Sequence, residues 1–165
     1  MRSLPRLLLT GFVGLAFAAP VMGQRADDQI QPKSAELQRQ AHALITAGKL
    51  EQADDALETA LAVDPRNRGA FIDLARVAEK QHLYGKAIRM TNKALLLEPN
   101  DPDAIAVQGE AMVEMGAVPR AQANLQKLQT ICGAKGCPQV AQLTAAISRG
   151  PAVASAKTPE TPKKD

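Results

Sequence analysis

The residues best suited to chemistry in this chain are its two cysteines. Cys132 and Cys137 are the only ones, and four residues, Gly-Ala-Lys-Gly, separate them. An even pair favours a disulfide in an oxidising compartment, with reactive thiols and metal binding as the alternatives. A thioredoxin-type redox motif has two intervening residues rather than four, and a closed zinc site needs four ligands. We therefore predict a structural disulfide and no metal site.

The two histidines are the other candidates. His82 falls at an expected turn between helices, where exposure is the default, and His42 falls inside an expected helix. Neither belongs to a recognisable motif with a serine or cysteine nucleophile. Because no set of residues supplies a nucleophile, a base and oxyanion donors together, we expect no enzyme activity and no cofactor. A small-molecule or metal-handling role through His42 and the cysteines is the remaining alternative.

An internal repeat of 34 residues predicts the helices that carry these side chains. Residues 48–67 and 82–101 align at this spacing. This period is typical of helix–turn–helix repeats, which bury their apolar faces by stacking on one another. No stretch shows the alternation of a β-strand, so the sequence predicts an all-α fold. The aligned pairs are Ala53 and Ala87, Ala60 and Ala94, and Pro65 and Pro99.

On these residues the sequence resembles the tetratricopeptide repeat (TPR) family, whose pattern has small residues at positions 8, 20 and 27 and proline at 32. The resemblance implies a solenoid of three helical hairpins, residues 34–67, 68–101 and 102–135. Thr91, Leu128 and Gly133 depart from the pattern. An amphipathic helix over 138–148 is expected to cap the last repeat, which would explain a large residue at 128.

The resemblance also implies a concave groove, lined by the first helix of each repeat, that binds an extended or helical partner segment. Some chaperone adaptors hold a carboxylate there with Lys at position 5 and Asn at position 9. Gln38 and His42 occupy those positions, so that clamp is absent. The acidic residues favour a partner carrying Lys or Arg; the alternative is a merely solvated helix face. The predicted lining is Gln38, His42, Ile45, Ile72, Arg76, Glu79, Glu110, Val113 and Glu114.

The two ends of the chain differ in composition from its centre. Arg2 and Arg6 precede an apolar stretch over 7–19 and then small residues, which is the layout of a signal peptide. We expect residues 1–23 to be removed on export to the periplasm or outside the cell, with cleavage after Ala18 or Gly23 and no membrane insertion afterwards; a retained anchor is the alternative. Residues 24–33 form a polar lead-in, and 150–165 a disordered tail.

Charge and aromatic content limit the classes of partner that this chain could bind. Loss of Arg2 and Arg6 with the leader would lower the formal net charge from +3 to +1. Charges are expected to alternate in sign along the helices, and the chain has only three Phe and one Tyr. Both features argue against a nucleic-acid partner. The sequence predicts a non-catalytic protein-interaction scaffold; the alternative is a structural subunit whose apolar ends pack in a homo-oligomer.

Overall fold

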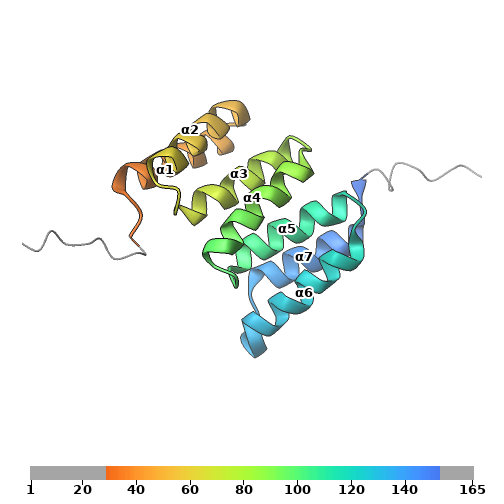
Figure 1. Cartoon of the computed structure of the whole chain (residues 1–165). Helices are drawn as coiled ribbons and strands as arrows, with labels where there is room; N and C mark the ends of the chain where they lie inside the picture. Colours follow the sequence, from red (N-terminus) through yellow and green to blue (C-terminus); the bar gives the residue numbers. More distant parts are fainter. Residues whose placement is uncertain (1–28, 153–165) are drawn as a thin grey trace, which may run out of the picture.

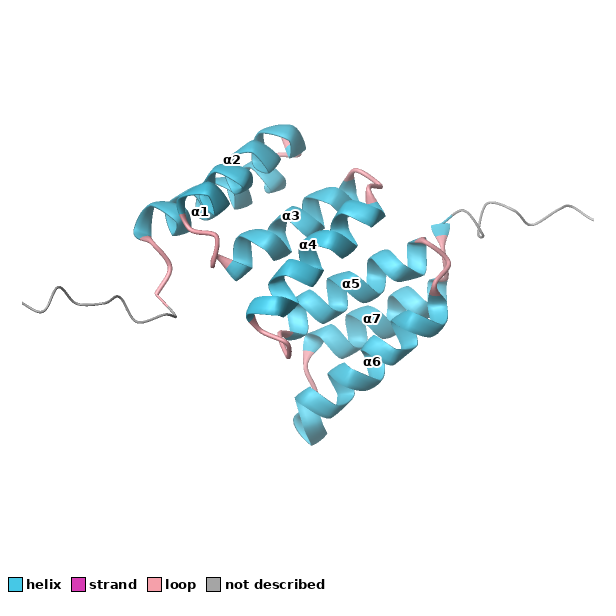
Figure 2. Cartoon of the chain, in the orientation of Figure 1, coloured by secondary structure: helices cyan, strands magenta, loops and turns pink. Residues whose placement is uncertain are grey.

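The computed structural model describes residues 29–152 as an all-helical array. This part of the chain contains no β-strand (Figure 2), which confirms the predicted fold class. The predicted signal peptide and residues 153–165 of the predicted tail lie outside the described residues. The elements are α1 (Pro32–Thr46), α2 (Leu50–Val63), α3 (Arg68–Lys80), α4 (Tyr84–Leu97), α5 (Pro102–Glu114), α6 (Val118–Cys132), the 3₁₀ turn η1 (Gly133–Lys135) and α7 (Pro138–Arg149).

Successive helices pair into three hairpins, α1 with α2, α3 with α4 and α5 with α6. The first helices of neighbouring hairpins also touch, α1 with α3 and α3 with α5, and do so more extensively than the second helices. The three hairpins and α7 follow one another along the array (Figure 1). We call the surface of α1, α3, α5 and α7 the inner face, and that of α2, α4 and α6 the outer face.

Small residues at the repeat positions allow the helices to pack closely. Ala53, Ala60, Ala87 and Ala94 have no exposed surface. Short side chains at these contacts permit interaxial distances near the low end of the roughly 8–10 Å range. Thr91, which departs from the pattern, is also fully buried, and its hydroxyl donates to the Ala87 carbonyl oxygen at 3.0 Å. The departure therefore leaves no polar atom unsatisfied.

Polar caps fix where the first helices of repeats two and three begin. The Asn67 side chain accepts the Ala70 N–H at 3.0 Å, and Asp101 accepts the Ala104 N–H at 2.9 Å. Each cap satisfies a donor that has no partner within the helix. Pro102 follows Asp101 at the first helical position, as its fixed φ favours.

The N-terminal boundary differs slightly from the prediction. Helix α1 begins at Pro32, so the last two residues of the predicted lead-in belong to the first helix. Gln31 also belongs to the folded unit, because its backbone N–H donates to the buried carboxylate of Asp64 at 2.9 Å. This hydrogen bond, followed by those from Arg66, lowers the pKa of Asp64 and holds it ionised.

Helix α7 covers the end of the array. It packs on both α5 and α6, and Leu128 and Leu143 are completely buried between them. A large residue at 128 therefore fills the space that faces a single capping helix. Gly109 of α5 lets α7 approach, because a Cβ at this position would lie 2.7 Å from the Leu143 methyl groups.

Candidate protein-binding site on the inner face

A buried carboxylate organises the first half of the inner face. Asp73 of α3, only 2% exposed, accepts a hydrogen bond from Gln38 Nε2 at 2.7 Å. His42 Nε2 lies 3.0 Å from the same oxygen, and Arg76 Nη1 donates to the other oxygen at 3.2 Å. The predicted residues Gln38, His42 and Arg76 are thus brought together by a residue that was not itself predicted to line the groove.

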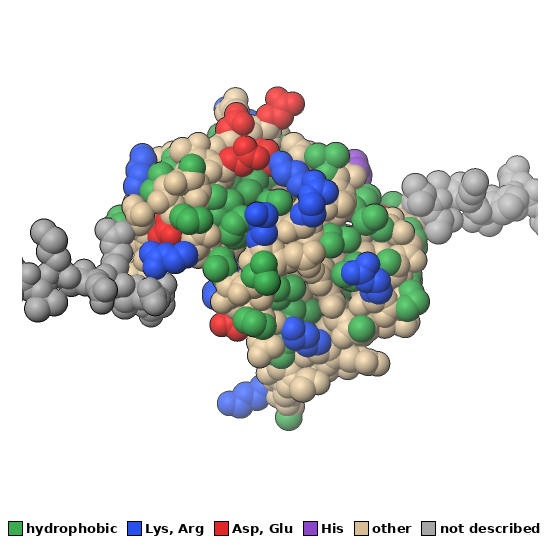
Figure 3. All heavy atoms as spheres, in the orientation of Figure 1, with side chains coloured by type: hydrophobic (Ala, Val, Ile, Leu, Met, Phe, Trp, Pro, Cys, Tyr) green, Lys and Arg blue, Asp and Glu red, His purple; other side chains and the backbone are tan. Residues whose placement is uncertain are grey.

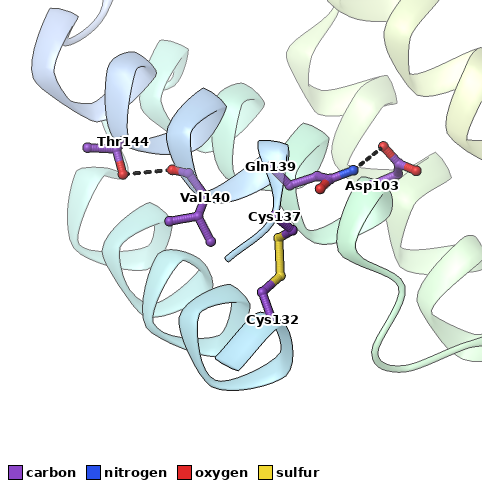
Figure 4. The surroundings of a disulfide bond; sticks show 6 residues. All are labelled: Asp103, Cys132, Cys137, Gln139, Val140 and Thr144. Carbon is purple, nitrogen blue, oxygen red and sulfur yellow. Dashed lines mark hydrogen bonds between the residues drawn. A yellow bond between two sulfur atoms is a disulfide. The ribbon is translucent and has the colours of Figure 1, made fainter. Parts of the chain in front are cut away.

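A second carboxylate extends this polar chain to the end of the array. Arg76 Nη2 donates to Asp103 Oδ1 of α5 at 3.0 Å, and Gln139 Nε2 of α7 donates to the same oxygen at 3.1 Å. Figure 4 shows Gln139 reaching from the start of α7 toward Asp103. One line of hydrogen bonds therefore crosses α1, α3, α5 and α7. These hydrogen bonds hold the four helices, which a bound segment would cross, at a fixed spacing.

An acidic hollow lies beside this chain, where α3, α5 and α7 meet. Its volume is about 240 Å³. Glu114 at its edge accepts the backbone N–H of Ala152 at 3.0 Å, so the chain after α7 leaves from this point. The charged and polar groups that line the hollow are Glu79, Lys80, Tyr84, Glu110, Glu114 and Arg149.

Partial burial makes two carboxylates of the hollow, Glu79 and Glu110, hard to ionise. Burial, reinforced by the nearby charge of Glu110, raises the pKa of Glu79 to about 8. Burial also raises the pKa of Glu110, although a hydrogen bond from Gln142 and the charges of Arg149 and Arg76 oppose the rise. A cation brought into the hollow would favour the ionised forms of both. The site can therefore accept a positively charged group.

Two predicted lining residues are not accessible. Ile72 and Val113 are 5% and 1% exposed, and both side chains belong to the hydrophobic core. We therefore remove them from the predicted lining. Ile45 is partly buried against the core of the first repeat, so part of its side chain still faces the surface. The accessible inner face is consequently more polar than the sequence suggested.

Three residues that position the site are not among the predicted lining residues. The spacing of three residues between Asp73 and Arg76 does place both on one helix surface, so a contact between them could be expected from the sequence. Asp103 and Gln139 had no such signal, because their contact joins α5 to α7 across 36 residues of sequence. Only the packing of the capping helix brings them together.

The disulfide lies at the opposite end of α7 from the hollow. The sulfur atoms of Cys132 and Cys137 are 2.01 Å apart, joining the end of α6 to the start of α7 (Figure 4). Gly133 and Gly136 both adopt positive φ, +57° and +66°, which lets the short connection reverse. Both thiols are used in this bond. Within residues 29–152, no group of three or more His, Cys, Asp or Glu side chains is placed to hold a metal ion.

One expectation about charge is wrong on the outer face. Helix α2 has four acidic residues and no basic one, whereas α4 and α6 have basic residues and no acidic one. Charges therefore segregate by repeat instead of alternating along each helix. Separately, no helix in the described part of the chain has the length and apolarity needed to cross a membrane.

Comparison with known proteins agrees with this geometry. Residues 44–110 match the family model described as tetratricopeptide repeat. The fold is a TPR solenoid. Two similar solved structures are the Sgt2 TPR domain from Aspergillus fumigatus (TM-score 0.66, 20% identity, 82% of this chain and 88% of that one) and the TPR2B domain of yeast Sti1 in its pHsp70 complex (0.65, 19%, 72% and 98%).

A third similar structure is the first TPR of Spaghetti (RPAP3) bound to the HSP90 peptide SRMEEVD, with a TM-score of 0.64 and 17% identity over 71% of this chain and 91% of that one. Identities this low establish a shared fold and leave the ligand of this solenoid open. No curated protein sequence shows significant similarity to the chain.

Proposed function

We propose that this protein is a non-catalytic scaffold that binds an extended segment of a partner protein along its inner face. The observation that carries the proposal is the acidic hollow between α3, α5 and α7, where a half-buried Glu79 faces Glu110. A solenoid presents such a face without needing to change shape. Among TPR structures of the same fold, one from RPAP3 is bound to an HSP90 peptide and the TPR2B domain of Sti1 is in a complex with pHsp70.

The charge of this hollow favours a basic partner segment. The HSP90 peptide on the RPAP3 domain, SRMEEVD, ends in acidic residues. In this chain α5 contributes Asp103, Glu110 and Glu114 and no basic residue, whereas Lys80 of α3 and Arg149 of α7 also line the hollow, so it is the α5 side of the hollow that disfavours an acidic peptide. A Lys or Arg side chain entering the hollow would neutralise carboxylates that are costly to ionise when unpaired. Gln38 and His42 offer accessible polar groups further along the same face.

The proposed location of this activity is the periplasm or the cell exterior. The proposal rests on the basic and apolar layout of residues 1–23 and on the paired cysteines, which suit an oxidising compartment. Fractionation of the native host, with the mass of the processed chain, tests it. A chain that retains residues 1–23 in the cytoplasmic fraction would contradict it.

Peptide selection tests the binding proposal. An array of random 12-residue peptides, half of them enriched in Lys and Arg, is probed with the wild-type chain. Selected peptides are then titrated against Glu110→Lys with Glu114→Lys. We expect basic peptides to be selected and the double variant to weaken their binding at least tenfold, with a loss of affinity at high salt.

A matched variant controls for net charge. Glu51→Lys with Asp55→Lys makes the same change on the exposed surface of α2, on the outer face. It should bind the selected peptides like the wild type. Selection of acidic peptides, or equal loss of binding in both double variants, would refute the inner face as the binding surface.

A further inference from the structure

The outer face carries acidic residues on its first repeat and basic residues on its second. Asp55 of α2 and Arg89 of α4 occupy the same position of their repeats, 34 residues apart, and Lys93 follows at the position of the uncharged Thr59. Figure 3 shows acidic side chains gathered over one end of this face and basic side chains over its middle and lower part. The face therefore has a negative band on the first repeat and a positive band on the second.

Most of these charges have no partner of opposite sign in the described structure. Lys86 alone bridges the bands, with Nζ 2.7 Å from Asp54 Oδ1 and 3.9 Å from Glu58 Oε1. Glu51 and Asp55 on α2 are exposed, as are Arg89 and Lys93 on α4, and within residues 29–152 none of the four forms an ion pair. Two exposed bands of opposite sign are thus available to an external partner.

Large apolar side chains are exposed beside the positive band. Leu96 near the end of α4 is 83% exposed, and Leu97 is 44% exposed. At the other end of α4, Leu83 and Met115 line a hollow of about 500 Å³ together with Arg89. Isolated exposed leucines are common on protein surfaces, so the case for an interaction surface rests on their position beside charges that have no ion-pair partner.

We propose that the outer face binds a second copy of this chain, with α2 of each copy against α4 of the other. The twofold axis runs parallel to α2 and α4 and lies outside the outer face, above the line midway between the two helices. It places residues at equal heights of α2 and α4 opposite one another. Asp55 then faces Arg89 of the second copy. Leu96 faces Ala62, the small residue at its own repeat position, so a large side chain meets a small one. Each contact occurs twice, as a twofold interface requires.

The presence of both signs on one face favours a second copy over other partners. A phosphate-rich surface, whether lipid or nucleic acid, would attract α4 and α6 but would be repelled by the four acids of α2. Each helix of 14 residues is about 21 Å long, so two helices cover roughly 400 Å² per copy. That area is below what stable dimers bury, so the dimer is weak and concentration-dependent.

Complementary charge reversal tests this interface. The first variant is Glu51→Lys with Asp55→Lys, and the second is Arg89→Glu with Lys93→Glu. Sedimentation velocity is measured over a concentration range reaching several hundred micromolar. We expect wild type to dimerise and each variant alone to remain monomeric. An equimolar mixture of the two should form heterodimers, because the basic residues on α2 and α4 of the first variant then face the acidic residues on α4 and α2 of the second.

Two further variants sharpen the test. Leu96→Ser should weaken the wild-type dimer at least fivefold. Arg120→Glu with Lys135→Glu changes charge beyond the α2–α4 seam and should leave dimerisation nearly unchanged; circular dichroism verifies that every variant is folded. Wild type that stays monomeric, or folded variants that fail to pair when mixed, overturns the proposal. Neither result bears on the inner face, because peptide binding there is measured independently.

Discussion

At the scale of single residues, Asp73 is the centre of the inner face. It is buried, and it receives hydrogen bonds or close contacts from side chains of α1 and α3. Removal of a buried acceptor leaves its donors without a partner, a loss that costs about 1–3 kcal/mol. The contacts of Asp73 therefore stabilise the junction between the first two repeats as well as shaping the binding surface.

We predict that Asp73→Ala lowers the free energy of unfolding by about 2 kcal/mol. Asp103→Ala is the comparison, because the Asp103 side chain is 46% exposed and water can replace its contacts. Its cost should stay below about 1 kcal/mol. Urea denaturation of the three proteins measures both values. Equal losses in the two variants would contradict a central role for Asp73.

Glu79 should make stability depend on pH. Its pKa of about 8 in the folded chain exceeds the value of 4.5 expected when unfolded, so the folded state retains a proton that the unfolded state releases. The free energy of unfolding should therefore fall as pH rises from about 5 to about 8. The window lies above the lowered pKa of Asp64, whose contribution is lost only in more acidic solution.

Glu79→Gln tests this dependence, because glutamine keeps the shape and cannot ionise. Denaturation at pH 5.5 and 8.5 should show a clear loss of stability in wild type and a much smaller loss in Glu79→Gln. The same slope in both proteins would place the titrating group elsewhere.

The sequence identified some of these residues and misplaced others for a physical reason. Gln38, His42 and Arg76, which the 34-residue phase assigned to the inner face, meet around Asp73 in the structure. Ile72 and Val113 lie on the adjacent side of their helices, where neighbouring helices bury them in the core. The sequence locates a helix face to within about one residue, whereas the boundary between core and groove depends on how far the adjacent helix overlaps it.

At the scale of elements, the capping helix depends on one glycine. Glycine inside a helix normally costs roughly 0.5–1 kcal/mol relative to alanine. Gly109 reverses this preference, because any Cβ there meets the buried methyl groups of Leu143. The close approach of α5 and α7 is what brings Gln139 within reach of Asp103.

Gly109→Ala should therefore destabilise the chain by roughly 1–3 kcal/mol through overpacking. Gly85→Ala is the matched control in α4, where the nearest atom to an added Cβ is Arg89 Nη1 at 3.8 Å. That variant should be neutral or stabilised by up to about 1 kcal/mol. Thermal melts distinguish the two. If both substitutions stabilise the protein, α7 does not pack as described.

The disulfide should contribute only modestly to stability. It closes a short connection between α6 and α7, for which the chain-entropy estimate is about 2 kcal/mol. Reduction should lower the melting temperature by several degrees and leave the helical circular dichroism largely intact. Intact mass after alkylation without reductant reports the bond in the native protein; two added alkyl groups would show that it is absent.

The order of the elements was readable from the sequence, while their exact ends were less so. The repeat spacing and the amphipathic pattern over 138–148 predicted three hairpins and a capping helix, which are the seven α-helices found within residues 29–152. The start of α1 at Pro32 was missed because it depends on Gln31 binding Asp64, a contact 33 residues away. The residues around Pro32 cannot indicate this contact, because it forms only when segments distant in the sequence have packed together.

At the scale of the whole molecule, we propose that the two faces bind different partners. The inner face is acidic toward its C-terminal end and would hold a basic segment. The outer face has bands of both signs and would hold a second copy. Since the faces lie on different helices, a dimer formed through α2 and α4 leaves both inner faces open. A weak dimer with two grooves would bind a partner with two basic segments more tightly than either groove alone.

The most direct test of the central claim is a chemical-shift titration of the isotopically labelled chain, beginning at Gln24, with a basic peptide selected as above. We predict shifts concentrated on inner-face residues of α3, α5 and α7, including Glu79, Glu110 and Glu114, and their disappearance in Glu110→Lys with Glu114→Lys. Shifts confined to α2, α4 and α6, or unchanged in the double variant, would contradict the inner face as the binding surface.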